Sequence, residues 1–285
     1  MAGRRAVGRD VHFYLSSEPD KPLGGMRLNP SVTEENFLSM LDILIVASGP
    51  YRVTLRSSGG DLMSTDDALK PGHYDIRPCS RRDTIAVTEE PCITRILSRT
   101  ITGRDDIFRA RVRERDGKCV ITGTVNVKAY RDDWTGFETA HIFPVSVSNE
   151  EYFVQNGFDT GINSCQNGLL MQSHIHQIFD AFDFSVNPDD GYKITCFDED
   201  PFGIDGRILD RICRDPNDKK SVPDELLRWH FRQAVLTNMR GAGEPSFEMD
   251  FPPGSDMMGE ILSGPEAAKR MEAELFSRLN GVSFG

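Results

Sequence analysis

The sequence predicts an α+β protein made of two successive units, and two observations support this prediction. Segments with the two-residue alternation of β-strands are interspersed with segments that carry apolar residues at helical spacing. A polar stretch at residues 78–91, rich in charged residues and bounded by prolines, separates a first group of such segments from a second. We therefore expect an N-terminal α+β domain over residues 1–95 and a second α+β domain, extended by C-terminal helices, over residues 96–285.

The N-terminal domain is predicted to contain several strands and one helix. Ser31 and Glu34 form a candidate capping box, and the apolar residues that follow recur on one helical face until Gly49 and Pro50 end the helix. Strands are expected at residues 11–15, at residues 51–55 and from residue 72, and a turn at residues 21–25. This order of elements is compatible with a small β-grasp-like unit.

The second domain is predicted to begin with a charged helix over about residues 107–116. Six basic and four acidic residues lie between Arg104 and Lys118, a density typical of a solvated helix face or of a face that contacts phosphates. Further helices are expected after Pro223 and after Pro265, where apolar residues again follow at helical spacing.

Charge and cysteine content narrow the class of function. The 285 residues carry a formal net charge of −11, which disfavours a generally basic nucleic-acid-binding surface but leaves room for a local one. The six cysteines are widely spaced and include no CxxC pair. This spacing argues against a disulfide scaffold and against a cysteine-rich zinc site.

Hydropathy indicates a protein without a membrane partner. The longest apolar stretch, at residues 41–47, is interrupted by Asp42 and is too short to span a bilayer. Asp10 and His12 stand where a signal peptide requires apolar residues. We therefore expect a soluble intracellular protein of the cytoplasm or nucleus.

The residues with the clearest chemical potential gather within residues 115–186. Three of the six histidines lie in this segment: His141, His174 and His176. From residue 172 onward the segment can be helical, and His176 and Asp180, four residues apart, would then share one face. An imidazole and a carboxylate placed in this way could bind a divalent ion together.

Three short patterns in this segment have a spacing that belongs to a known family. They are Ala140-His141-Ile142 with Pro144, then Asn167-Gly168-Leu169-Leu170, and then His176 nine residues after Asn167. Together they resemble the HNH endonucleases, whose fold is the ββα-metal module. Residues 115–123, Arg-Asp-Gly-Lys-Cys-Val-Ile-Thr-Gly, are similar to a segment that precedes the first histidine in HNH proteins common in fungi. The module covers about a quarter of the chain, and the resemblance makes the N-terminal domain an accessory domain.

The resemblance assigns roles that ordinary chemistry supports. His141 would be the general base that takes a proton from the water attacking a phosphodiester, and Asn167 would brace the loop that aims this base. His176 would bind one Mg²⁺, Mn²⁺ or Zn²⁺, and Asp180 matches a position that sometimes supplies a further ligand. Nucleic acid is the partner that the resemblance implies.

Two positions depart from the family pattern. The residue before the base is usually a metal-binding Asp or His, but here it is Ala140. Glu138, two residues earlier on the same strand face, is the candidate replacement. Many HNH modules also hold a structural zinc with two CxxC motifs, and here Thr122, Gln172 and Ile175 occupy three of those positions.

The remaining candidates are substrate contacts, and two alternative functions stay open. Arg113 and Arg115 on the charged helix, Trp134 and His174 are the expected substrate-binding residues. Ala140 and the acidic charge favour a first alternative, a small-molecule enzyme of the cyclase or pericyclase type in natural-product biosynthesis. In that enzyme the histidines and nearby aromatic residues would form an organic pocket that needs no metal or other cofactor. The second alternative is a non-catalytic interaction module, and the sequence leaves the oligomeric state open.

Overall fold

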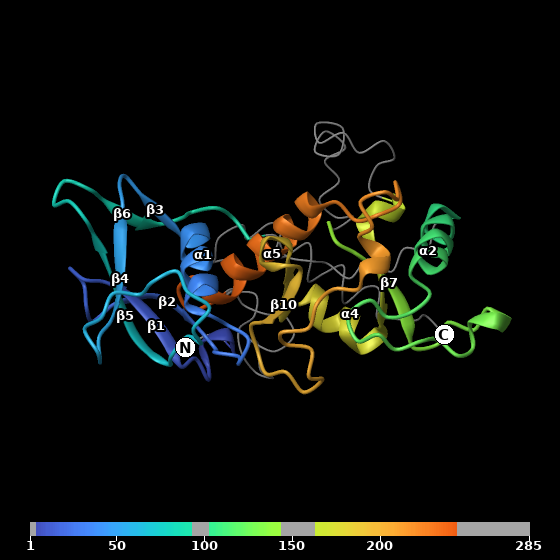
Figure 1. The fold of residues 1–285 in the computed structure, drawn as a ribbon, viewed down its shortest axis with the longest axis horizontal. Helices are drawn as coiled ribbons and strands as arrows, with labels where there is room; N and C mark the ends of the chain where they lie inside the picture. Colours follow the sequence, from blue (N-terminus) through green and yellow to red (C-terminus); the bar gives the residue numbers. More distant parts are fainter. Residues whose placement is uncertain (1–3, 93–102, 144–162, 244–285) are drawn as a thin grey trace, which may run out of the picture.

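The computed structural model describes residues 4–92, 103–143 and 163–243, and its first domain has β-grasp topology. Strands β1 (Val11–Leu15), β2 (Pro22–Met26), β4 (Tyr51–Leu55) and β5 (Gly72–Pro78) form one sheet in the order β2-β1-β5-β4. β1 pairs antiparallel with β2 and parallel with β5, and β4 pairs antiparallel with β5. Helix α1 (Glu34–Leu44) packs its apolar face against this sheet (Figure 1). The α+β prediction is therefore confirmed, and the β-grasp-like order holds.

The cap of α1 differs from the prediction. Thr33, not Ser31, is the N-cap: its hydroxyl accepts a hydrogen bond from the Asn36 amide at 3.2 Å, and the Asn36 side chain accepts one from the Thr33 amide at 3.2 Å. Ser31 instead donates through its hydroxyl to Asp205 at 2.8 Å. The expected Ser31–Glu34 capping box is wrong because Ser31 is held by a residue of the second domain.

Two segments that were expected to be irregular are strands. Residues 22–26 form β2 rather than a turn, and the polar stretch contains β6 (Ile85–Val87), which pairs antiparallel with β3 (Ile45–Ala47). At Gly24 a Cβ atom would lie 2.0 Å from the carbonyl oxygen of Met239. Glycine is thus needed at position 24 because the backbone of a distant helix comes close to this strand.

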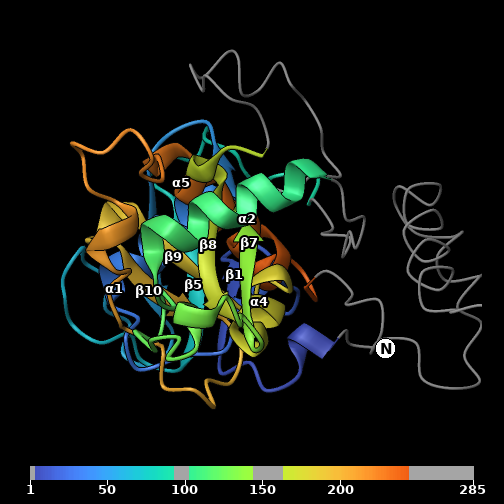
Figure 2. The same cartoon turned by 90° about the vertical axis from the view of Figure 1, so that its right-hand side faces the viewer.

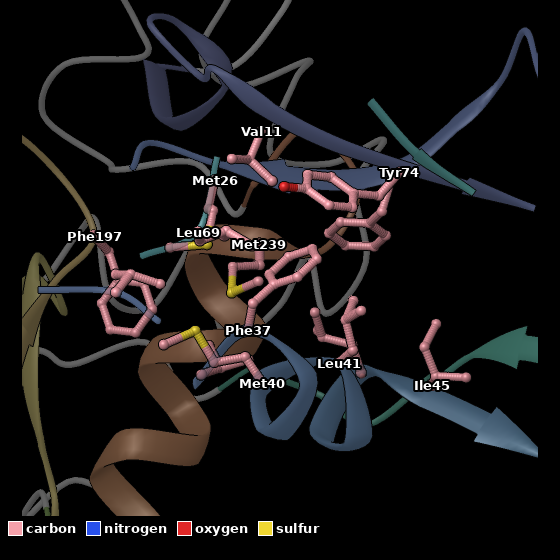
Figure 3. Close-up of a cluster of buried hydrophobic side chains, with 14 of the residues drawn as sticks. Val11, Met26, Phe37, Met40, Leu41, Ile45, Leu69, Tyr74, Phe197 and Met239 are labelled. Carbon is pink, nitrogen blue, oxygen red and sulfur yellow. The ribbon is translucent and has the colours of Figure 1, made fainter. Parts of the chain in front are cut away.

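That distant helix is α5 (Asp224–Met239), which follows Pro223 as predicted and completes the core of the first domain. Phe231, Val235 and Met239 on α5 pack into the cluster that contains Phe37 and Met40 of α1. Figure 3 shows Met239 and Phe197 beside these two side chains. Residues far beyond position 95 therefore contribute to the core of the N-terminal domain. The domain boundary at residue 95 stays a prediction.

The second domain is built around a β-hairpin with one helix on each face. Strands β7 (Phe137–His141) and β8 (Gly168–Gln172) pair antiparallel and are followed by α4 (Ser173–Asp180), which gives a ββα order. Helix α2 (Gly103–Asp116) lies across the hairpin on the side that faces the viewer in Figure 2. Leu169 and Met171 share a cluster with the α4 side chains, whereas Leu170 packs against α2. The two helices thus cover opposite faces of the hairpin.

The remaining elements complete the described part of the chain. A second hairpin of β9 (Phe184–Asn187) and β10 (Lys193–Cys196) packs against α5. Short 3₁₀ turns lie at Arg4–Ala6 (η1), Ala129–Arg131 (η2), Cys165–Asn167 (η4), Pro188–Asp190 (η5) and Arg211–Cys213 (η6). The helix expected after Pro265 lies outside the described residues. Within the residues described, no helix has the length and apolar character needed to cross a membrane.

Replacing Gly24 with alanine should destabilise the protein by at least about 1–3 kcal/mol, the usual cost of overpacking a core. The new methyl group would collide with the Met239 carbonyl and with the ring of Phe13, 2.6 Å away. Urea denaturation measures the change. Gly60→Ala is the control, because the nearest atom to its Cβ is the Ser58 hydroxyl at 3.6 Å. Equal stabilities for the two variants would contradict the close packing of β2 on α5.

Candidate functional site

The register of the β7–β8 hairpin decides which way each candidate residue points. His141 pairs with Gly168 at the end of the ladder, and Glu138 pairs with Met171. Because side chains alternate along a strand, His141 lies on the α2 face, whereas Glu138 and Ala140 lie on the α4 face. The site is therefore divided between the two faces of one hairpin.

His141 is held on the α2 face by an aromatic ring and an amide. Its imidazole stacks on Phe108 of α2 with ring centroids 4.1 Å apart and planes 11° apart, and its Nε2 lies 3.1 Å from Oδ1 of Asn163. At Gly168, opposite His141, a Cβ atom would lie 2.6 Å from the Phe108 ring. Glycine at this position makes room for the ring that supports His141.

Asn163 is a site residue that the sequence did not single out. It stands four positions before Asn167 in a run of small polar residues, and nothing in its spacing separates it from a loop residue. Only the turn around Ser164, which precedes η4, places its amide next to the imidazole.

Asn167 is completely buried and connects β8 to the chain just after His141. Its Oδ1 accepts a hydrogen bond from the Phe143 amide at 2.8 Å, and its Nδ2 donates to the Phe143 carbonyl at 3.0 Å. Its own carbonyl accepts a hydrogen bond from the Ile142 amide at 3.0 Å. These contacts hold in place the chain that follows His141.

On the other face, His176 lies between two carboxylates. Nδ1 is 2.7 Å from Oε2 of Glu138, and Nε2 is 3.1 Å from Oδ2 of Asp180. Burial disfavours the charged imidazole, but the hydrogen bonds to Asp180 and Glu138 outweigh burial and raise the pKa of His176 to about 9. The hydrogen bond between Glu138 and His176 also holds the pKa of Glu138 below its ordinary value. His176 is thus an imidazolium at neutral pH.

This cluster has the donor chemistry of a two-ligand cation site. Two arrangements are possible: Glu138 with Nδ1 of His176, or Asp180 with Nε2, would supply one oxygen and one nitrogen ligand. The remaining carboxylate would then hydrogen-bond to the other ring nitrogen and orient the ring. Ala140 is fully buried and contributes no ligand. Within the parts of the chain that the structure describes, no three His, Cys, Asp or Glu side chains are arranged to hold a metal ion. A divalent ion would therefore keep several water ligands and would first have to displace a proton from His176.

The positions of the family's zinc motifs are occupied by ordinary packing. Thr122 donates a hydrogen bond from its hydroxyl to the Gln172 side chain at 2.8 Å, and Ile175 is buried.

Arg115 is placed differently from the prediction. Its side chain is 1% exposed and forms an ion pair with Asp116, with Nε 2.6 Å from Oδ1 and Nη2 3.0 Å from Oδ2. Its guanidinium also donates to three main-chain carbonyls, those of Cys165, Gly168 and Lys220. All five N–H donors are thereby used, so the expected role of Arg115 in binding substrate is corrected to a structural one.

The other expected substrate contacts lie in two places. The Arg113 guanidinium lies 4.9 Å from the Trp134 ring centroid, and Trp134 packs beside the cluster of Phe108. Burial lowers the pKa of Arg113 from its ordinary value. His174 is exposed in the first turn of α4 and contacts Phe202. The structure thus brings Arg113 and Trp134 to the His141 side and leaves His174 apart from them.

Comparison with known families agrees with this geometry. Residues 119–187 match the family described as HNH endonuclease, and residues 8–82 match a family described as a domain of unknown function. The chain therefore carries an HNH-family domain, which spans β7, β8, α4 and β9, after a distinct N-terminal domain. No curated protein and no solved structure matches the chain.

His176 should titrate with a pKa of about 9 in NMR, because two carboxylates stabilise its charged form. This raised pKa stabilises the fold by up to about 3 kcal/mol below pH 6.5, and the contribution is lost as the pH rises through 9. Glu138→Gln should lower the pKa. A His176 pKa near 6.5 in the wild type would contradict the carboxylate contacts.

Arg115→Ala should destabilise the protein by about 3–5 kcal/mol, since it leaves the buried Asp116 carboxylate without its partner. Chemical denaturation provides the measurement. Arg111→Ala, at an exposed position of the same helix, is the matched control and should change stability by about 0.5 kcal/mol or less. A small effect at Arg115 would show that the residue is available for substrate after all.

Proposed function

We propose that this protein is a nuclease that hydrolyses phosphodiesters of nucleic acid, with His141 as the general base. The observation that carries the proposal is the fixation of His141, which lies within the matched HNH segment, stacks on Phe108 and contacts Asn163. The resemblance to HNH endonucleases assigns the role of the base to this histidine. An imidazole held in one orientation at the end of a strand is suited to remove a proton from an attacking water.

The contact with Asn163 orients the ring of the proposed base. Nε2 of His141 lies 3.1 Å from Oδ1 of Asn163, which, together with the stacking on Phe108, fixes the direction of the imidazole. Asn167 keeps the following chain in place through its two hydrogen bonds to Phe143. Two asparagines therefore position His141: Asn163 contacts its ring, and Asn167 holds the backbone that follows it.

Basic side chains on α2 support a phosphate near this base. Arg109 and Arg113, four residues apart, lie on the same side of α2, and Nε of Arg113 is buried without a hydrogen-bond partner. An anionic oxygen would satisfy that donor. The positive charge needed for nucleic acid is thus supplied locally, although the whole chain is acidic.

His176 with Asp180 or Glu138 is the pair that would hold a divalent cation on the α4 face. When bound, Mg²⁺, Mn²⁺ or Zn²⁺ supplies positive charge that stabilises the transition state and the leaving oxygen of phosphodiester hydrolysis. The chain's own contribution is to orient this pair, since Glu138 and Asp180 fix the His176 ring from both sides.

A second candidate is a metal-independent enzyme that acts on a small organic molecule. The buried Ala140 and the charged state of His176 favour it, because neither offers a ready metal ligand at neutral pH. In this case EDTA would leave the activity unchanged.

His141→Ala should reduce cleavage of a labelled DNA or RNA substrate in Mn²⁺ by about 10²–10⁴-fold, the usual contribution of general base catalysis. The thermal midpoint should change little, because His141 is only partly buried. His73→Ala, at an exposed position of β5, is the matched control and should cleave like the wild type. Wild-type protein that neither binds nor cleaves nucleic acid with Mn²⁺ would contradict the proposal and favour the second candidate.

Affinity for Mn²⁺ should be weak at neutral pH and should rise by about tenfold per pH unit until the pH approaches 9, because the ion replaces a proton on His176. Isothermal titration calorimetry at several pH values gives this slope. Tight, pH-independent binding to the free protein would show that other residues hold the ion.

A further inference from the structure

The turn between α2 and β7 exposes an unusual set of apolar side chains. We define residues 124–134 as the 124–134 loop, which includes η2. Within six residues it exposes Val125, Val127 and Tyr130, with 59%, 78% and 85% of their surface accessible. In Figure 1 the loop lies at the end of the molecule farthest from the N-terminal domain.

The loop is held in one conformation, so this exposure is a fixed feature of the surface. Asn126 donates from Nδ2 to the Asp133 carbonyl at 2.9 Å, and its Oδ1 accepts from the Lys128 amide at 3.0 Å. Asp133 accepts from the Thr135 amide at 3.1 Å. Burying an aromatic ring and two valines would ordinarily stabilise a fold, so their presentation on a braced turn indicates a surface that binds something.

The charges around Tyr130 are suited to a polyanion. Lys128 and Arg131 flank it, about half exposed, and both point to a single carboxylate, that of Asp133, at 3.7 and 3.0 Å. Asp132 and Asp133 balance these two charges within the loop, and Arg113, which lies on the Trp134 ring, adds one positive charge beside it. This combination of a cation and an exposed aromatic ring is the one that single-stranded nucleic acid uses, through backbone phosphates and stacked bases.

The loop is also continuous with the proposed catalytic face. Trp134, its last residue, carries the Arg113 guanidinium on its ring and packs beside the cluster of Phe108, on which His141 stacks. A strand that passes Trp134 could thus contact Arg113 on its way from Tyr130 toward the α2 face of the hairpin, where His141 lies. No such path joins the loop to α4, whose face of the hairpin is the opposite one.

We propose that the 124–134 loop is the platform on which an unpaired nucleic-acid strand stacks its bases, and that the substrate is consequently single-stranded. This inference rests on the nuclease proposal and narrows it. Tyr130 is the stacking residue, the valines widen the apolar surface, and Lys128 with Arg131 contact phosphates. Paired bases present only their edges and could not lie flat on the ring.

The test compares binding of a fluorescein-labelled single-stranded DNA with binding of its duplex, by anisotropy at low salt with EDTA so that no cleavage occurs. Tyr130→Ala should weaken single-strand binding by about 5- to 100-fold and leave duplex binding unchanged, as expected for the loss of one stacked base. Tyr130→Trp should retain binding. Met63→Ala removes another exposed apolar side chain, with 63% of its surface accessible, from the N-terminal domain and should have no effect.

The salt dependence of DNA binding distinguishes the contribution of base stacking from that of phosphate contacts. Tyr130→Ala should leave the log–log salt slope unchanged, whereas Lys128→Ala and Arg131→Ala should each reduce it by about 0.7.

The outcomes distinguish this inference from the function on which it rests. Cleavage by the wild type with equal single-strand affinity in Tyr130→Ala would overturn the platform and leave the nuclease proposal standing. Failure of the wild type to bind either form of DNA, or the corresponding RNA, would overturn both. Self-association that sedimentation shows to depend on Tyr130 would assign the loop to a protein interface instead.

Discussion

The arrangement of the second domain depends on the buried ion pair of Arg115 and Asp116 at the end of α2. Asp116 accepts a hydrogen bond from the Leu170 amide at 2.8 Å, and Arg115 donates to the carbonyls of Cys165 and Gly168. These bonds fasten α2 to the strand and the turn that carry Asn167. Because two buried charges are costly unless fully paired, the helix has one position in which all of the hydrogen bonds form. That position sets Phe108 under His141.

With α2 fixed, the β7–β8 hairpin separates two chemically different groups of side chains, one on each of its faces. A residue and its neighbour on a strand point to opposite faces, so a base at position 141 and a cation-holding side chain at position 138 or 140 cannot share a face. The base therefore lies in an aromatic and amide environment beneath α2, whereas His176 lies among carboxylates on α4. A nuclease mechanism that uses both therefore requires a substrate that reaches from one face of the hairpin to the other.

The sequence predicts well what local patterns determine. The strand β5 and the helix after Pro223 follow from periodicity and turn residues, and the ββα order follows from the resemblance to the HNH family. Glu138 could be chosen from strand alternation once Ala140 was seen to lack a ligand, and the structure places it against His176. Asn167 could be chosen because it belongs to a family pattern, and in the structure it is buried and hydrogen-bonded to Phe143.

What the sequence missed depends on contacts between distant residues. Gly24 indicates a turn locally but lies in the strand β2. A glycine is needed there because α5, from far along the chain, approaches its backbone closely. Arg115 belongs to a charged run and looks exposed, yet its partners include a carbonyl at position 220. Asn163 gains its importance only when its amide meets His141. Each of these residues has a role that arises from tertiary packing, which periodicity and local spacing do not encode.

The most direct test of the account is a crystal structure with Mn²⁺ and a single-stranded oligonucleotide whose phosphorothioate linkage resists cleavage. The account predicts a phosphate at the end of β7, within hydrogen-bonding distance of a water that contacts the imidazole of His141. It also predicts an anomalous Mn²⁺ signal beside His176, with one of the two carboxylate contacts to the ring replaced. An oligonucleotide bound away from His141, or Mn²⁺ bound elsewhere while His176 still lies between Glu138 and Asp180, would contradict it.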